Sequence, residues 1–308
     1  MTEKNKNLIV RVATALVLLP LILWLIAQGG LWFTLLISVV AGAAALELNL
    51  LPGAGGAASP AAAPEPAAEL TRKERKKVRA ASPEREERSA LSGAAIASVG
   101  AAFVLPLLDE VSVPLLSVKS LLAALVILSF ADALLFEEEL SRAPSRVGLA
   151  VLGAAYPGLL ISALVRLRQL DQGAWWVVLA LVVTWFNDTG AYFAGRAFGK
   201  RKLYPRISPS KTWEGAIGGG LASIAGAVLT QHFFLPAVPV WGAAAIGLGA
   251  SVLGPLGDLS ESLLKRSFGA KDSGKLLPGH GGLLDRIDAL LFNAPFVLLC
   301  ARLLATQQ

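Results

Sequence analysis

The sequence predicts an all-α fold, a polytopic bundle of membrane-spanning helices. Apolar residues occupy 55% of the 308 positions and charged residues only 16%. Apolar runs of about 20 residues recur along the chain, and a helix of that length crosses the ~30 Å hydrocarbon core of a bilayer. Most of the Lys and Arg residues fall in the short segments between these runs. These three observations predict a multi-pass membrane protein.

About nine apolar runs are expected to form spans, and a count of eight or ten stays open. The first run follows Lys4 and Lys6 but is longer than the about 7 to 15 residues of a signal-peptide core, so we expect it to be retained. The nine runs are 8–27, 31–51, 90–108, 114–135, 147–165, 175–195, 215–235, 238–259 and 287–305.

The distribution of basic residues predicts a cytoplasmic N-terminus. This orientation places in the cytoplasm the loops that hold most of the Lys and Arg, as the positive-inside rule requires. Arg166 and Arg168 are the exception, because the same scheme places them outside. The predicted cytoplasmic loops are 52–89, 136–146, 196–214 and 260–286.

The chain divides into four predicted parts. The polar loop ends in "TRKERKKVRAASPEREER", whose mixed charges and lack of apolar periodicity predict a solvated tether near anionic lipid. The parts are an N-terminal transmembrane hairpin (1–52), a cytoplasmic polar loop (53–89), middle transmembrane helices (90–174) and a C-terminal transmembrane region (175–308).

The charge pattern argues against nucleic-acid binding, and the cysteine content excludes an internal disulfide. The formal net charge is +6, but the basic residues lie in short loops between apolar runs, so they serve topology and anion contacts, and nucleic acid is not an expected partner. Cys300 is the sole cysteine, so the chain holds no internal disulfide.

Four acidic residues lie toward the predicted inner ends of spans: Glu47, Asp132, Asp188 and Asp258. An ionisable group at membrane depth costs several kcal/mol unless it is paired or hydrated, so such positions are functional candidates. Their common depth predicts a hydrated cavity open to the cytoplasm. For Asp188, a role in helix packing beside small neighbours stays an alternative.

The stretch "KRSFGAKDSGKLLPGHGGLLDRID" (265–288) ties two acidic helix ends together. Asp258 and Ser262 are four residues apart, and Asp285 and Asp288 three apart, so each pair shares a helix face. Carboxylates beside Lys and Arg suit Mg²⁺ and a polyphosphate, and a loop that serves only topology is the alternative. The basic residues of this stretch are Lys265, Arg266, Lys271, Lys275 and Arg286.

A second polar constellation comprises "WFNDTGAYFAGRAFGK" and "RISPSKTWEG". Phosphate contacts are expected from Ser208, Ser210, Lys211 and Thr212. Glu214 is expected at the start of the seventh span, near its positive helix end. A basic loop followed by an ordinary helix cap is the alternative.

These stretches resemble the phosphatidate cytidylyltransferases, also called CDP-diacylglycerol synthases. The resemblance rests on "SLLKRSFGAKDSGKLLPGHGGLLDRID" (262–288), with "NDTGAYFAGR" and "SPSKTWEG" as further blocks in the family's order. Two departures stand out: Ser210 occupies a position where the family more often has lysine, and the loop from Pro52 to Ser89 is long.

The resemblance implies that CTP and phosphatidic acid react at a lipid bilayer to give CDP-diacylglycerol and pyrophosphate. It implies a requirement for Mg²⁺ and is compatible with a second, monovalent cation such as K⁺ and with a homodimer. It also implies a multi-pass protein of a bacterial inner (plasma) membrane, whose active site faces the cytoplasm. The implied metal ligands are Asp258 and Asp285, with Asp288 and Asp188 as further ligands or their partners. The implied catalytic residues are Lys265, Arg266, Lys271, Asp272, His280 and Arg286. The implied substrate contacts are Ser208, Ser210, Lys211, Thr212, Ser262, Gly281 and Gly282.

In the implied reaction, a phosphatidate oxygen attacks the α-phosphorus of CTP in line. The acceptor is already ionised, so positioning and charge neutralisation matter more than a general base. Two alternatives stay open. A CTP-dependent lipid kinase would release CDP instead of pyrophosphate, and a transporter of anionic solutes would use Asp188 and Asp258 as coupling sites.

Overall fold

The computed structural model describes residues 3–51, 92–111, 116–137, 140–274, 276 and 281–305, and the side chains of residues 16–304 within these ranges. The helices that precede the second constellation are α1 (Glu3–Gln28), α2 (Gly30–Asn49), α5 (Gly93–Glu110), α6 (Val118–Phe136), α7 (Ala143–Ala154) and α8 (Ala163–Arg168). The remaining helices are α9 (Gly173–Phe198), α10 (Trp213–Phe234), α11 (Val240–Ser267) and α12 (Leu284–Ala305). Two short strands, β1 (Lys202–Tyr204) and β2 (Ser208–Thr212), lie between α9 and α10.

The predicted all-α membrane bundle is confirmed. Within the described ranges, eight helical segments are long and apolar enough to cross a membrane, and the continuous passage Leu140–Arg168 counts as one of them. The first predicted span falls on α1, whose residues Leu16–Gln28 form a shorter apolar helix. All nine predicted spans therefore coincide with helices of the structure.

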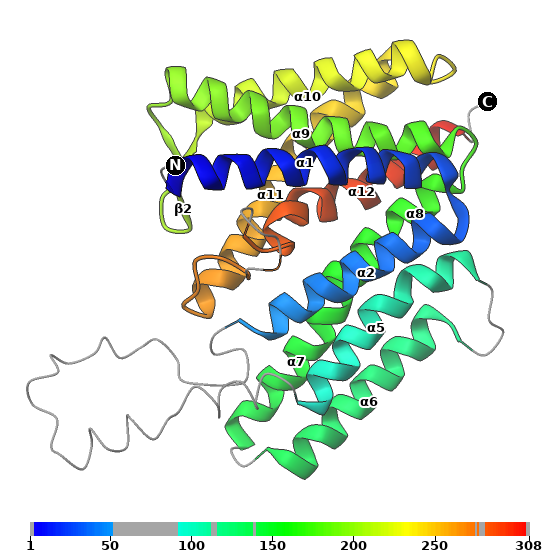
Figure 1. Ribbon diagram of the computed structural model, residues 1–308, viewed down its shortest axis with the longest axis vertical. Coiled ribbons are helices and arrows are strands. Elements are labelled where there is room, and N and C mark those ends of the chain that lie inside the picture. Colours follow the sequence, from blue (N-terminus) through cyan, green and yellow to red (C-terminus); the bar gives the residue numbers. More distant parts are fainter. Residues whose placement is uncertain are drawn as a thin grey trace, which may run out of the picture.

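The helices form two groups that meet at α1, α2 and α12 (Figure 1). Helices α9 and α10 lie side by side with α11 and α12 crossing them, whereas α2, α5, α6 and α7 run obliquely beside this group. The start of α1 and the β-hairpin lie at one end of the bundle, which we call the hairpin end, and α12 finishes near the opposite, far end.

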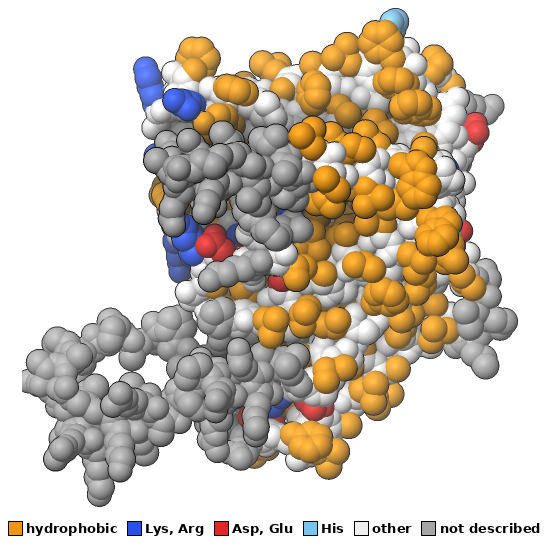
Figure 2. Space-filling view, viewed as in Figure 1, with side chains coloured by type: hydrophobic (Ala, Val, Ile, Leu, Met, Phe, Trp, Pro, Cys, Tyr) orange, Lys and Arg blue, Asp and Glu red, His pale blue; other side chains and the backbone are white. Residues whose placement is uncertain are grey.

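The surface between the two ends is apolar. Figure 2 shows hydrophobic side chains spread over the middle of the visible face, while Lys and Arg side chains gather at the hairpin end. Large apolar side chains that are exposed on several helices include Trp24, Leu134, Phe193, Leu221 and Val252. A surface of this kind suits the hydrocarbon of a bilayer, where a soluble protein would instead carry polar residues.

Helix α11 is longer than the sequence predicts. It extends to Ser267, whereas the apolar run was expected to end at residue 259. Its 28 residues span about 42 Å, which exceeds the ~30 Å hydrocarbon thickness, so its last turns project beyond the apolar layer. Because α11 continues to Ser267, the polar residues Asp258, Glu261 and Lys265 all lie on a regular helix.

The segment expected as a loop at 196–214 instead contains an antiparallel hairpin. Lys202 pairs with Thr212, and Tyr204 with Ser208. The side chain of Thr212 accepts a hydrogen bond from the Gly215 N–H at 3.1 Å and so caps the start of α10. The helix cap of the alternative is confirmed, its loop is instead a hairpin, and the predicted phosphate contacts stay a prediction.

The fifth span is irregular. A π-helical turn, Ala155–Leu159, separates α7 from α8 and contains Pro157. Proline lacks an N–H and cannot continue the regular helical ladder, which accounts for a break here. The turn directs Tyr156 into the bundle, where its ring lies edge-on to Phe292 of α12 with a centroid separation of 6.3 Å.

The two arginines that depart from the predicted charge pattern bind other helices at the far end. Arg166 pairs with Asp109 at the end of α5, with a nitrogen–oxygen distance of 2.6 Å. Arg168 donates to the carbonyls of Ile26 and Ala27 in the last turn of α1. The last carbonyls of a helix lack partners within it, so Arg168 satisfies groups that α1 leaves open. The orientation of the bundle in a membrane stays a prediction.

Candidate active site

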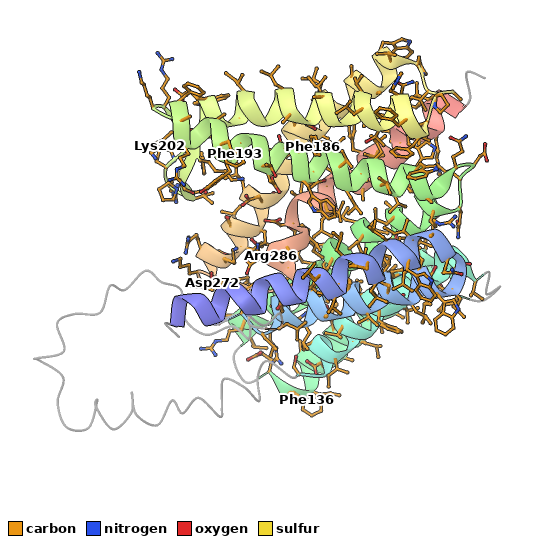
Figure 3. The ribbon with its side chains drawn as sticks, turned by 45° about the horizontal axis from the view of Figure 1, so that its top comes forward. Phe136, Phe186, Phe193, Lys202, Asp272 and Arg286 are labelled. Atoms are coloured by element: carbon orange, nitrogen blue, oxygen red, sulfur yellow. The ribbon has the colours of Figure 1, made fainter. Side chains whose placement is uncertain are left out.

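A cavity of about 450 Å³ with both polar and apolar walls opens at the hairpin end, between α9, the hairpin, the start of α10 and α11. Figure 3 shows the end where it lies, with Lys202 on the hairpin and Asp272 and Arg286 near the segment between α11 and α12. The residues around it include Asp188, Tyr192, Arg196, Ser210, Lys211, Thr212 and Asp258. The cavity brings the second polar constellation together with Asp258, whereas none of the described residues within 265–288 lines it.

Lys211 and Asp258 form an ion pair in the wall of this cavity. The Lys211 ammonium lies 2.5 Å from one carboxylate oxygen of Asp258, and the Ser262 hydroxyl donates to the other at 3.3 Å. Asp258 and Ser262 therefore share a helix face, as their spacing predicts. Both members of the ion pair are partly exposed, at 24% and 36% of their side-chain surface, so a ligand in the cavity can reach them.

Two further carboxylates stand near Asp258. Asp188 of α9 and Asp288 of α12 both lie within electrostatic range of Asp258, and Asp188 also lines the cavity. Three helices thus contribute one carboxylate each to the same region. Its small neighbour Gly190 packs closely on α10, where an added Cβ would lie 2.6 Å from the Cβ of Ala222, and a packing role of Asp188 stays the alternative.

A second polar cluster surrounds Lys265. Its ammonium lies 2.5 Å from a carboxylate oxygen of Glu261, one helical turn earlier, and 2.5 Å from a carboxylate oxygen of Asp285 on α12. The other oxygen of Asp285 accepts the N–H groups of Ser273 at 3.1 Å and Gly282 at 3.3 Å. Glu261 is almost fully buried, at 1% exposed, so Lys265 supplies the positive charge that its carboxylate needs.

The predicted pairing of Asp258 with Asp285 is not what the contacts favour. Asp258 contacts Lys211, whereas Asp285 contacts Lys265 and backbone N–H groups. Within the described ranges, no group of three or more His, Cys, Asp or Glu side chains is arranged to hold a metal ion. The shared ion of Asp258 and Asp285 stays a prediction.

The donor chemistry beside Asp258 nevertheless suits a hard cation. The buried side-chain oxygens of Asn187 and Asn293 have no hydrogen-bond partner in the structure. Both amides flank Gly254 of α11, since a Cβ there would lie 3.0 Å from the Asn293 nitrogen and 3.7 Å from that of Asn187. Carboxylate and amide oxygens are the ligands that Mg²⁺ takes in proteins. These side chains are thus of the types that Mg²⁺ takes as ligands, and a metal site here stays a prediction.

The other predicted site residues are spread over the hairpin and the signature segment. Arg266 donates to the carbonyl of Ala270 at 3.1 Å, folding back on the end of α11. Gly281 has a φ of +84°, which glycine adopts without strain, and Gly282 packs against Ser273 and Asp285. Exposed predicted residues are Ser210, Lys271, Asp272 and Arg286, while Ser208 is partly buried on β2. His280 and Lys275 lie outside the described residues, so their roles stay predictions.

The single cavity expected from four acids at equal depth is wrong for two of them. Asp188 and Asp258 line it, but Asp132 lies 3.6 Å from Arg146 of α7, and Glu47 contacts the segment between α11 and α12. Equal depth does not fix the direction in which a residue points from its helix, and spans that are apolar on all sides give no indication of it.

Three residues near these clusters were not among the predicted site residues. Glu261 is one of them, although its spacing of four residues from Lys265 is the signal for an ion pair on one helix face. The others are Asn187 and Asn293, which are uncharged, lie on apolar helices and carry no comparable signal.

Comparisons with known proteins identify the family of the chain. A sequence model described as "Cytidylyltransferase family" matches residues 74–304. A phosphatidate cytidylyltransferase of Bacillus subtilis is 47% identical over 152 residues, which are 49% of this chain and 56% of that protein. One of Brucella suis is 46% identical over 160 residues, 51% of this chain and 58% of that protein. The chain thus spans little more than half the length of these relatives. The family match covers most of the chain, and the protein belongs to the cytidylyltransferase family.

Proposed function

We propose that this protein transfers the cytidylyl group of CTP to phosphatidic acid, giving CDP-diacylglycerol and pyrophosphate. The observation that carries the proposal is the cavity in which Lys211 faces Asp258 at the end of an apolar bundle. Family membership and relatives named phosphatidate cytidylyltransferase support it. The substrates differ in solubility, and the cavity lies where a soluble polyanion and a lipid headgroup can meet.

The nucleotide triphosphate is expected to bind from the hairpin side of the cavity. Lys211 and Arg196 line this side, and the guanidinium of Arg196 donates to the Tyr192 hydroxyl at 3.1 Å. An ammonium held only by a partly exposed carboxylate can turn to a phosphate at small cost, because both contacts are charge-assisted. Lys211 would therefore exchange Asp258 for a phosphate oxygen when the nucleotide enters.

The lipid is expected to approach along α9 and α10. Phe193, Phe198, Trp213 and Ile217 are exposed on these two helices near the hairpin end, and Figure 3 labels Phe193 on α9. Acyl chains can lie against these side chains while the phosphate reaches the cavity. Aromatic residues at the edge of an apolar surface favour such a position at the membrane interface.

Asp188, Asp258 and Asp288 are the residues that we propose to hold Mg²⁺, with Asp285 as the further candidate from the sequence. A bound divalent cation would neutralise charge on the triphosphate. Without one, three neighbouring carboxylates would repel a polyanion, so the acidic cluster itself argues for a cation as part of the substrate complex. We also propose that a monovalent cation such as K⁺ binds and that the protein forms a homodimer. Its location would be a bacterial inner membrane, with the hairpin end toward the cytoplasm.

The reaction forms a bond between a phosphatidate oxygen and the α-phosphorus of CTP, and breaks the bond from that phosphorus to the bridging oxygen of pyrophosphate. The attacking oxygen is ionised at neutral pH, so no side chain has to remove a proton. The work of the protein is to align the two phosphates and to balance their charge. Lys211 and Lys265 are the described lysines placed among the acidic residues to do so.

The proposal is tested by supplying the purified protein in detergent with CTP, phosphatidic acid and Mg²⁺. Pyrophosphate and CDP-diacylglycerol should appear in equal amounts. Release of CDP with a newly phosphorylated lipid would favour a lipid kinase, and solute flux in liposomes without CTP consumption would favour a transporter. Either result would reject cytidylyl transfer.

A further inference from the structure

Glu47 is a buried acid that reaches the signature segment from another part of the chain. It lies in the last turn of α2 and is only 5% exposed. The family model begins at residue 74, so Glu47 lies outside the matched residues. Its side chain nevertheless contacts residues on both sides of the turn between α11 and α12.

One carboxylate oxygen of Glu47 accepts two hydrogen bonds. The N–H of Leu284 donates to it at 2.8 Å, and the hydroxyl of Ser273 donates at 3.1 Å. Leu284 is the first residue of α12, where the N–H has no partner within the helix and the helix dipole favours a negative charge. Glu47 thus serves as an N-terminal cap that is supplied by a different helix.

The same segment is held from its other side by Asp285. The N–H of Ser273 donates to Asp285 while its hydroxyl donates to Glu47, so Ser273 lies between the two carboxylates. A Cβ on Gly282 would lie 2.9 Å from an oxygen of Glu47 and 2.9 Å from one of Asp285, and would clash with Ser273. A Cβ on Gly274 would lie 2.5 Å from Glu47. The chain is packed directly around the Glu47 carboxylate.

We propose that Glu47 is a positioning residue, which holds the segment between α11 and α12 so that Asp285 faces Lys265. Removing its carboxylate would release Ser273 and the start of α12, and Asp285 would lose the backbone donor that Ser273 provides. The N-terminal hairpin is therefore part of the scaffold of the active site. The inference rests on the proposed function only where it concerns turnover, because the contacts themselves can be measured without substrate.

The test compares Glu47→Ala, Glu47→Gln and Ser273→Ala with the unaltered protein. Asp132→Asn is the matched control, because it also removes a buried acid, on α6, and pairs with Arg146 away from the segment. Hydrogen–deuterium exchange of peptides that cover 268–274 and 281–288 reports on the segment without substrate. Steady-state kinetics with CTP and phosphatidic acid report on turnover.

For Glu47→Ala we expect exchange in these peptides to become at least about tenfold faster while exchange in α9 is unchanged. We expect kcat to fall about 10- to 100-fold, the range typical for loss of a residue that orients a ligand group, with the KM for CTP within about threefold. Glu47→Gln keeps an oxygen acceptor and should recover most of both quantities. Ser273→Ala should raise exchange about fivefold, as loss of one hydrogen bond implies, and it leaves α2 intact if Glu47→Ala does not fold.

Exchange that stays unaltered in both Glu47→Ala and Ser273→Ala would overturn the inference. Equal acceleration in Asp132→Asn would overturn it too, because the effect would then reflect general destabilisation. Glu47→Gln with normal exchange but the low kcat of Glu47→Ala would show that the carboxylate acts on the reaction directly. If the unaltered protein does not consume CTP, the proposed function fails, and the exchange data still decide whether Glu47 holds the segment.

Discussion

The ammonium group of Lys211, on β2, lies 2.5 Å from the carboxylate of Asp258, on α11. The pair joins a hairpin outside the apolar bundle to a helix within it. Both side chains are partly exposed, and ion pairs of this kind contribute only about 0–1 kcal/mol to stability. A bound polyanion could therefore compete with Asp258 for Lys211, as the proposed function requires.

Lys211→Ala should lower kcat/KM for CTP roughly 10- to 100-fold, because a hydrogen bond to a charged group contributes about 1.5–3 kcal/mol. The unfolding temperature should change little. Lys202→Ala is the matched control, since Lys202 is an exposed lysine of the partner strand β1. Steady-state kinetics should show that variant within about twofold of the unaltered protein. Equal losses in the two variants would point to surface charge in general and against a specific contact.

Lys265→Met should destabilise the protein by about 3–5 kcal/mol, because it leaves Glu261 and Asp285 together without their shared cation. Activity should be lost as well. Lys265→Arg retains the charge and should recover most of the stability but less of the activity, since a planar guanidinium does not reproduce the two contacts of an ammonium. Thermal unfolding in detergent measures the first effect. A Lys265→Met protein of normal stability would show that the cluster is not an ion pair in solution.

Gly282→Ala should reduce activity strongly, because the added methyl group would clash with Ser273 and crowd the oxygens of Glu47 and Asp285. Gly100→Ala on α5 is the control, since a Cβ there meets no atom within 4 Å. At that helical position alanine should be neutral or stabilising by up to about 1 kcal/mol. CTP turnover and thermal unfolding of both variants measure the difference. A Gly282→Ala enzyme with full activity would contradict the tight packing of the segment.

Asp132→Asn should lower stability and leave catalysis intact. Asp132 is buried and lies 3.6 Å from Arg146, which keeps a second partner in Glu137 at 2.5 Å. The loss should be about 1–2 kcal/mol, the contribution of one interaction in a surviving cluster. Thermal unfolding should show the decrease, while kcat and KM stay within about twofold. A selective loss of kcat would contradict this and would support the sequence-based expectation that Asp132 belongs to the active site.

The helical framework could be predicted because hydrocarbon thickness dictates the length of an apolar run. The structure at the predicted inner ends of the helices could not be predicted. Helix α11 continues through Asp258, Glu261 and Lys265, polar residues that end the apolar run but not the helix. The hairpin at 202–212 also escaped prediction, because its strands are short and have no apolar alternation.

The polar residues of the site could be predicted better than their partners. Spacing in sequence placed Asp258 beside Ser262 on one helix face, and the structure confirms this contact. Partners on different helices depend on rotation about the helix axis and on the path of the chain between α11 and α12, which spacing in sequence does not determine. This is why Asp285 was expected beside Asp258 but is found against Lys265.

The position of the transferred label tests the proposed reaction most directly. Purified protein is incubated in detergent with phosphatidic acid, Mg²⁺ and CTP that carries a radioactive label on either the α- or the γ-phosphate. Cytidylyl transfer predicts that the α-label enters the lipid and that the γ-label is released in pyrophosphate, with both products diminished by Lys211→Ala. A γ-label that enters the lipid, with the α-label left in CDP, would contradict the account.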